Sequence, residues 1–163
     1  MKNSFLVILT LVGIQQINAQ FTRRDSLQGG LRIERTSYDV KRYDLNITIN
    51  PEQKSIKGFN EISFEVMVPT QKIQLDLFDN MKVDSIVWNT KKLKYNRDND
   101  AVFIDFPEKL ASKSNHKLKF YYSGNPKIAK NAPWDGGFVF SKDKAGKDFI
   151  AVAVQGTGAS LWY

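Results

Sequence analysis

Few residues of this sequence could carry out chemistry, and that scarcity excludes several classes of enzyme. The 163 residues include no cysteine and one histidine, His116. Without cysteine there can be no disulfide, thiol catalysis or cysteine zinc site. One histidine cannot supply the two that an HExxH zinc motif needs. His116 lies in a polar Ser-Asn-His-Lys stretch, so we expect a solvated loop residue rather than a catalytic or metal-binding one.

Two short stretches have the composition of ligand-binding loops but lack required parts. Residues 98–100 (Asp-Asn-Asp) alternate carboxylates as a calcium loop does. They lack the glycine and the distal glutamate of such loops, so they predict a hairpin turn. Residues 156–158 (Gly-Thr-Gly) resemble part of a phosphate loop. No helical pattern follows them, so they predict a glycine turn.

Gln155 is a more specific candidate, because it follows the apolar run Phe149–Val154 and precedes Gly156. A strand would deliver its carboxamide to a bend in the chain. A carboxamide held there can accept a hydrogen bond from an ammonium group and donate one to a carbonyl. From the residues alone two interpretations stay open. Gln155 either binds a ligand in a cleft or satisfies backbone groups at the end of the strand.

The segments that must position these residues alternate apolar and polar side chains with a period of two, which predicts strands with one buried face. The apolar run Phe149–Val154 predicts a strand buried on both faces. Gly58 interrupts the alternation and predicts a bulge. No segment after residue 20 has helical periodicity, so we expect an all-β fold, a β-sandwich or curved double sheet. The expected strands cover residues 43–49, 56–68, 73–77, 83–88, 93–95, 102–106, 118–122, 138–140 and 149–154.

The N-terminus has the pattern of a secretory signal peptide over residues 1–19. A positively charged start precedes the apolar run Phe5–Ile14, which is too short to span a membrane, and Ala19 offers a small residue for cleavage before Gln20. Residues 20–37 are polar and predict a linker or arm. We therefore expect an exported product, periplasmic, secreted or at the cell surface, with no transmembrane segment in the mature chain.

The net charge of +7 is spread over many lysines. No aromatic motif of an RNA-binding sheet accompanies it, so the charge predicts a solvated face and no nucleic-acid partner.

Four segments taken in order carry a family resemblance: residues 38–45 (Tyr-Asp-Val-Lys-Arg-Tyr-Asp-Leu), 56–58 (Ile-Lys-Gly), 134–138 (Trp-Asp-Gly-Gly-Phe) and 155–163. Together they resemble the N-terminal domain of the zinc aminopeptidase family that includes aminopeptidase N and leukotriene A hydrolase, above all its exported members from Bacteroidetes-type bacteria. The resemblance places this domain at residues 38–163. It implies a saddle-shaped β domain packed against a thermolysin-like catalytic domain, which carries the GxMEN and HExxH motifs. Neither motif occurs here, which implies a chain cut before the catalytic domain.

The resemblance also implies a role. The domain would scaffold the catalytic domain and form one wall of the peptide cleft, with Gln155 lining the pocket for the first residue of a peptide substrate. Zinc would belong to a full-length parent, and this chain alone would bind no cofactor and be inactive. Many members have an acidic residue where this chain has Thr157.

A different class of function also stays open, a stand-alone exported β-sandwich that binds carbohydrate or protein. Exposed Trp88, Trp134 and Trp162 would serve that function. If the chain is instead cut from a longer protein, its apolar end, residues 161–163 (Leu-Trp-Tyr), predicts a bare apolar surface.

Overall fold

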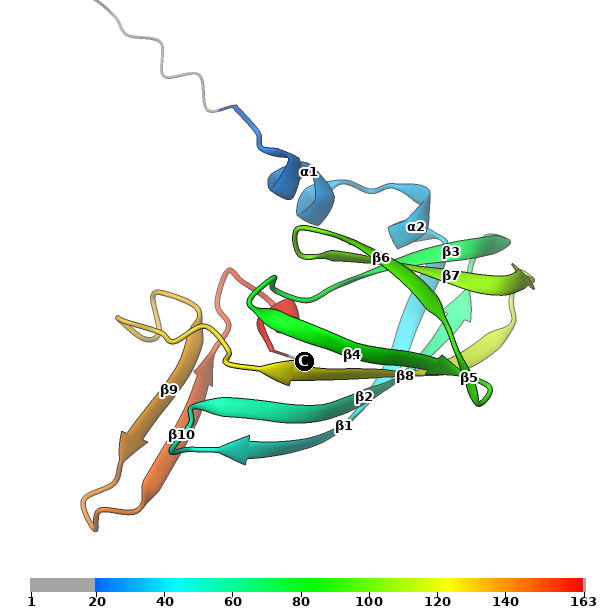
Figure 1. Cartoon of the computed structure of the whole chain (residues 1–163). Coiled ribbons are helices and arrows are strands. Elements are labelled where there is room, and N and C mark those ends of the chain that lie inside the picture. Colours follow the sequence, from blue (N-terminus) through cyan, green and yellow to red (C-terminus); the bar gives the residue numbers. More distant parts are fainter. Residues whose placement is uncertain (1–19, 163) are drawn as a thin grey trace, which may run out of the picture.

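The computed structural model describes residues 20–162. Strands make up 56% of these residues and helices 10%, which confirms the all-β prediction. The described strands form three antiparallel sheets, ordered β1-β2-β8-β4-β5, β3-β7-β6 and β10-β9 (Figure 1). The predicted signal peptide and Tyr163 lie outside the described residues. The strands are β1 (Tyr38–Asn50), β2 (Ser55–Val66), β3 (Thr70–Asp76), β4 (Met81–Trp88), β5 (Lys91–Lys92), β6 (Lys94–Asp98), β7 (Ala101–Leu110), β8 (Asn115–Gly124), β9 (Gly137–Lys142) and β10 (Asp148–Ala153).

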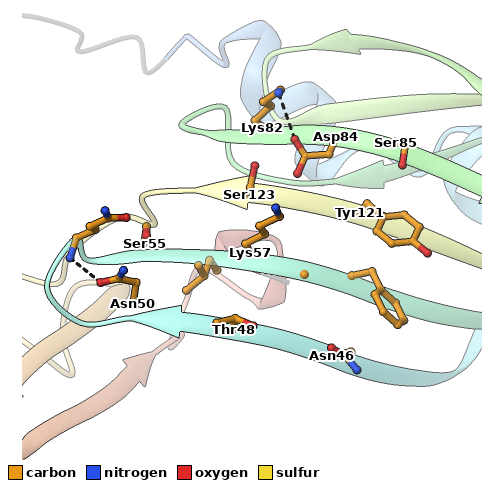
Figure 2. Close-up of a pocket in the computed structure, with 14 residues that line it drawn as sticks. Asn46, Thr48, Asn50, Ser55, Lys57, Lys82, Asp84, Ser85, Tyr121 and Ser123 are labelled. Carbon is orange, nitrogen blue, oxygen red and sulfur yellow. Dashed lines mark hydrogen bonds and ion pairs between the residues drawn. The ribbon is translucent and has the colours of Figure 1, made fainter.

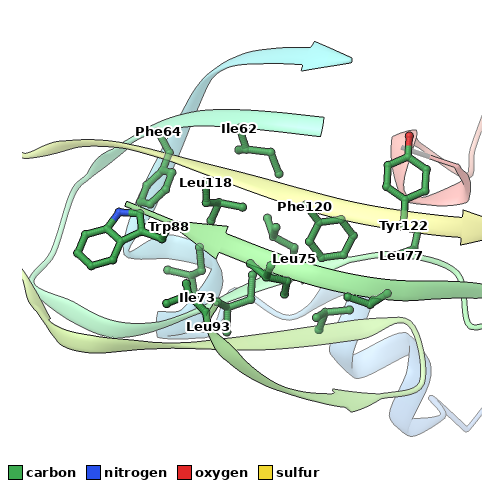
Figure 3. Close-up of a cluster of buried hydrophobic side chains, with 14 of the residues drawn as sticks. Ile62, Phe64, Ile73, Leu75, Leu77, Trp88, Leu93, Leu118, Phe120 and Tyr122 are labelled. Carbon is green, nitrogen blue, oxygen red and sulfur yellow. The ribbon is translucent and has the colours of Figure 1, made fainter. Parts of the chain in front are cut away.

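The core lies between the five-stranded and the three-stranded sheet, as in a sandwich (Figure 3). Alternation puts every second side chain of a strand on the inner face. Burying one such large apolar side chain contributes about 1.5–3 kcal/mol. The fully buried side chains include Ile62 and Phe64 of β2, Ile73 of β3, Ile104 of β7 and Phe120 of β8.

The predicted bulge at Gly58 is wrong. The pairing of β1 with β2 runs through Gly58 without interruption, and its register shifts between Val40 and Arg42 instead. A Cβ atom on Gly58 would lie 2.0 Å from the backbone oxygen of Asn46. Glycine is therefore needed for the close approach of β1, a requirement that breaks the apolar pattern just as a bulge does. The predicted hairpin turn is confirmed, with Asn99 at φ 53° between β6 and β7.

Residues 20–37 are not an irregular arm. They contain α1 (Arg23–Gly29) and α2 (Ile33–Thr36), which lie against the three-stranded sheet in Figure 1. Thr22 and Asp25 form a capping box at the start of α1, which satisfies backbone N–H groups of its first turn. Helices of 7 and 4 residues are too short for a period of 3.6 to emerge from the sequence. No helix within residues 20–162 has the length and apolarity to cross a membrane.

Side chains fasten this helical arm to the sheet. Leu27 of α1 is 2% exposed, and its carbonyl accepts a hydrogen bond from Gln74 Nε2 at 3.0 Å. Arg24 pairs with the buried carboxylate of Asp100 at 2.9 Å, and Arg35 pairs with Asp76. The arm is thus part of the folded domain.

Candidate functional site

Gln155 lies in a turn just beyond the end of β10, which confirms that a strand delivers it to a bend. The backbone N–H groups of Thr157 and Gly158 both donate to the carbonyl of Val154, at 3.1 and 3.0 Å. Gly156 and Gly158 have φ angles of 74° and 73°, which favour glycine. The turn therefore has a defined backbone, and the Gln155 side chain is exposed at its start.

The Gln155 carboxamide makes no hydrogen bond with residues 20–162. The interpretation that the Gln155 side chain satisfies backbone groups at the end of β10 therefore has no hydrogen bond to support it in the described part of the chain. An exposed amide on a held turn has both its oxygen and its nitrogen available for an external ligand.

Two of the segments that carry the family resemblance meet beneath this turn. Gly136 is buried, and a Cβ atom there would lie 2.3 Å from Thr157 Oγ1. The loop before Gly136 is fixed by the Asp135 carboxylate, which accepts from the backbone N–H groups of Lys130 and Asn131 at 2.6 and 2.7 Å. The hydrogen bond from Lys130, followed by that from Asn131, lowers the pKa of Asp135. The turn with Gln155 thus rests on an ordered loop.

A hollow of about 590 Å³ lies between this turn and the helical arm. Residues 156–160 line one side, and Asp25, Gln28 and Arg35 line another. Gln155 itself does not line it. Arg35 pairs with Asp76 at its edge, so Asp25 leaves the lining with one negative charge in excess.

The β9–β10 hairpin carries an apolar outer face beside the Gln155 turn. Phe140, Ile150 and Val152 pack against the core. The opposite face of the hairpin carries the side chains of Phe149, Ala151 and Ala153 of β10. Val139 of β9, which pairs with Ala151, lies on the same face. Phe149 is 54% exposed, so the prediction of a strand buried on both faces is wrong. The reason is that β10 pairs with β9 alone and this hairpin extends away from the large sheet (Figure 1).

The bare apolar end expected at residues 161–163 is also wrong where it can be checked. The 3-10 helix Ala159–Leu161 turns the chain back, and Leu161 is 0% exposed. Trp162 is half-buried, with its ring edge-on to Phe138 at 5.4 Å between centroids. Tyr163 lies outside the described residues.

The three tryptophans do not form a binding surface. Trp88 is 4% exposed and belongs to the core, and Trp162 packs against this core. Trp134 is 82% exposed. A carbohydrate- or protein-binding role through all three side chains therefore has no structural basis.

His116 is not a solvated loop residue. It lies in β8, half-buried between Phe64 and Trp88, each 5.7 Å away between ring centroids. Burial lowers the pKa of its imidazole, and Glu108 opposes that shift. Its Nε2 atom lies 2.8 Å from Ser114 Oγ.

A zinc site does not fit the described residues. Within residues 20–162 no three histidine, cysteine, aspartate or glutamate side chains are placed to hold a metal ion. A catalytic zinc needs about three protein ligands, so no step through a metal can be assigned to this chain.

Comparison with known proteins identifies the family. Residues 39–157 match the sequence model described as the peptidase M1 N-terminal domain. An M1 zinc metallopeptidase from Deinococcus radiodurans has 22% identity and a TM-score of 0.54, covering 68% of this chain and 27% of that chain. A mutant M1 zinc metallopeptidase from the same organism, bound to a Tyr-Ser-Ala substrate, has 21% identity and a TM-score of 0.54, covering 69% and 28%. Native leukotriene A4 hydrolase from Saccharomyces cerevisiae has 14% identity and a TM-score of 0.60, covering 78% and 20%.

At these identities the solved structures show a common fold. No curated protein sequence matches the chain. The chain spans about a quarter of the length of the M1 metallopeptidases it matches. Because the family's own sequence model matches most of the chain, this protein belongs to the peptidase M1 N-terminal domain family.

Proposed function

We propose that this domain scaffolds a peptidase catalytic domain and lines its peptide cleft through Gln155. The observation that carries the proposal is the exposed, unengaged carboxamide of Gln155 on a turn held by two backbone hydrogen bonds. A group that must meet a substrate at a defined point needs this combination of free polar atoms and a fixed backbone. In a cleft, the amide oxygen accepts from the substrate's terminal ammonium group.

The outer face of the β9–β10 hairpin is the surface on which the catalytic domain docks. Ala153, at the end of β10, lies next to the Gln155 turn, and the exposed Phe149 lies near the start of the same strand. The other apolar side chains of this face are half-buried, and apolar surface that stays partly exposed marks interfaces. Docking there puts Gln155 at the junction of the two domains. The catalytic domain supplies the zinc, for which residues 20–162 have no ligand cluster.

The protein is exported. The sequence pattern of residues 1–19 supports this, and cleavage after Ala19 leaves Gln20 as the first residue. Sequencing the N-terminus of protein recovered from its native cells tests this step. A mature start at Gln20 supports export, and an intact Met1 contradicts it.

Reading the gene downstream of Tyr163 tests the scaffold role. A continuous frame that encodes GxMEN and HExxH supports it. A stop codon with no neighbouring gene for such a catalytic domain contradicts it.

A further inference from the structure

The outer face of the five-stranded sheet changes character along its length. Near the β1–β2 turn, two rows of side chains cross β1, β2, β8 and β4 in register. Figure 2 shows the labelled members of both rows on the same face. Most of their side chains are uncharged amides, hydroxyls or aromatic rings. The rows are Asn46, Phe59, Tyr121 and Ser85, followed by Thr48, Lys57, Ser123 and Lys82.

The rest of this face is filled with ion pairs. In the adjoining row Glu61 lies between Lys117 at 3.3 Å and Lys119 at 3.6 Å. Arg42 and Asp44 pair at 2.5 Å on β1. Charged side chains there satisfy one another in water, as on an ordinary solvated sheet. The two rows depart from that pattern, because six of their eight side chains are uncharged.

These rows form an open groove of about 910 Å³. The side chains of Asn46, Thr48, Ser85, Ser123 and Tyr121 make no hydrogen bond with residues 20–162. Five neighbouring side chains therefore offer free donors and acceptors at fixed positions on a rigid sheet.

The groove also has an aromatic end and little net charge. The rings of Phe59 and Tyr121 lie 5.1 Å apart between centroids and are inclined by 44°. Lys82 pairs with Asp84 at 3.3 Å, as the dashed line in Figure 2 shows. Among the described residues, Lys57 is then the one cation of the groove without a carboxylate partner.

We propose that this groove binds a neutral carbohydrate chain. A sugar ring presents an apolar face that stacks on an aromatic ring and hydroxyls that both donate and accept. Those are the two chemistries that the groove combines. Hydroxyls of the sugar are satisfied by the free amide and hydroxyl groups of the two rows, and one ring packs on Tyr121.

Other occupants fit the groove less well. An extended peptide gains its affinity by pairing with a free strand edge, whereas the side chains of this groove stand on the face of the sheet, whose central strands β2 and β8 are paired on both sides. A nucleic acid needs several cations for its phosphates, and Lys57 alone is unpaired here. The proposal does not depend on a catalytic domain or on Gln155.

To test this, the purified 163-residue chain is titrated with five hexasaccharides, which are derived from cellulose, xylan, mannan, amylose and chitin. Calorimetry and NMR detect the binding. At least one should bind with a Kd on the order of 1 mM or tighter. Amide shifts should be confined to β1, β2, β8 and β4 around the groove. Tyr121→Ala and Asn46→Ala should each weaken binding about tenfold or more, because each removes one of the two chemistries.

The matched control is Asn115→Ala, which removes an exposed asparagine at the start of β8, outside the groove. It should leave the Kd unchanged, and Tyr121→Phe should retain most of the affinity because the ring remains. Circular dichroism checks that each variant is folded. The proposal is overturned if none of the five sugars binds at 5 mM, or if binding survives Tyr121→Ala and Asn46→Ala in folded protein.

Discussion

At the scale of single residues, Asn60 is the least expected side chain in the molecule. It is 0% exposed, and neither Oδ1 nor Nδ2 has a hydrogen-bond partner among residues 20–162. A buried polar group without a partner costs about 1–3 kcal/mol. Asn60 lies opposite Leu45 and Phe120 on the inner face of the sheet, where an apolar side chain would be ordinary.

Replacing Asn60 should therefore stabilise the domain. Leucine has a similar branched shape without polar atoms, so Asn60→Leu should raise the free energy of unfolding by about 1–3 kcal/mol. Urea denaturation monitored by tryptophan fluorescence measures the change. The control is Asn115→Leu at an exposed position on β8, which should change the free energy by less than about 0.5 kcal/mol. A large loss for Asn60→Leu would show that the amide has a structural partner.

At the scale of elements, the helical arm is the part that the sequence did not reveal. Arginine-rich polarity indicated a linker, yet those arginines pair with Asp76, Asp98 and Asp100 across some 40 to 76 residues of sequence. Partners that far apart have no local signature. The strands were predictable, because an alternation with a period of two can be recognised from neighbouring residues of the sequence. The groove on the outer face of the five-stranded sheet was not predictable, because its rows of side chains come together only once the register of four strands is known.

One buried apolar side chain, that of Leu27, contributes to the docking of the arm beside its ion pairs. Leu27 is 2% exposed, whereas Leu31, four residues on, is 86% exposed. Leu27→Ala should lower the free energy of unfolding by about 2–5 kcal/mol, because it empties a packed site. Leu31→Ala is the matched control and should stay within about 0.5 kcal/mol. Thermal and urea melts measure both. Equal, small effects would mean that the arm is not packed in solution.

Acid should loosen the same arm. Hydrogen bonds from Thr22 lower the pKa of Asp25, and the hydrogen bond from Arg23 lowers that of Asp98. A carboxylate whose pKa is lowered in the folded state stabilises that state at pH values above 3.8, the ordinary pKa of aspartate. The contribution is lost as the pH falls through the lowered pKa.

The double variant Asp25→Asn with Asp98→Asn should melt at a lower temperature than the parent chain at pH 7, and this difference should shrink toward pH 3. Glu52→Gln, at an exposed turn position, serves as the control and should show no such trend. A difference that is the same at both pH values would contradict the hydrogen bonds assigned to Asp25 and the ion pair assigned to Asp98.

At the scale of the whole molecule, the domain combines a buried core with two surfaces that we propose bind other molecules. One is the turn and hairpin face around Gln155, which we propose lines a peptide cleft, and the other is the groove on the outer face of the five-stranded sheet. The sequence led to Gln155 through its position after an apolar run. The close approach of Gly136 to Thr157 was not predictable from the sequence, because residues 21 positions apart meet only after both loops fold.

The chain on its own should neither retain zinc nor cleave aminoacyl reporter substrates. It has one histidine and no cysteine, and a peptidase zinc needs about three ligands and a base. Metal analysis of the purified chain and a fluorogenic peptidase assay measure this. Stoichiometric zinc or turnover that survives repurification would contradict the proposed scaffold role.

The proposed role of Gln155 is tested most directly by the kcat/KM of a full-length parent enzyme that carries this domain, with and without Gln155→Ala. We predict a loss of about tenfold or more for aminopeptide substrates, or roughly 1.4 kcal/mol of transition-state binding. Stability should stay unchanged, because the exposed carboxamide makes no hydrogen bond within residues 20–162. Gln53→Ala, which alters an exposed glutamine in the β1–β2 turn, should leave kcat/KM as it was. If Gln155→Ala likewise leaves kcat/KM unchanged in normally folded enzyme, Gln155 does not bind substrate and its proposed role is wrong.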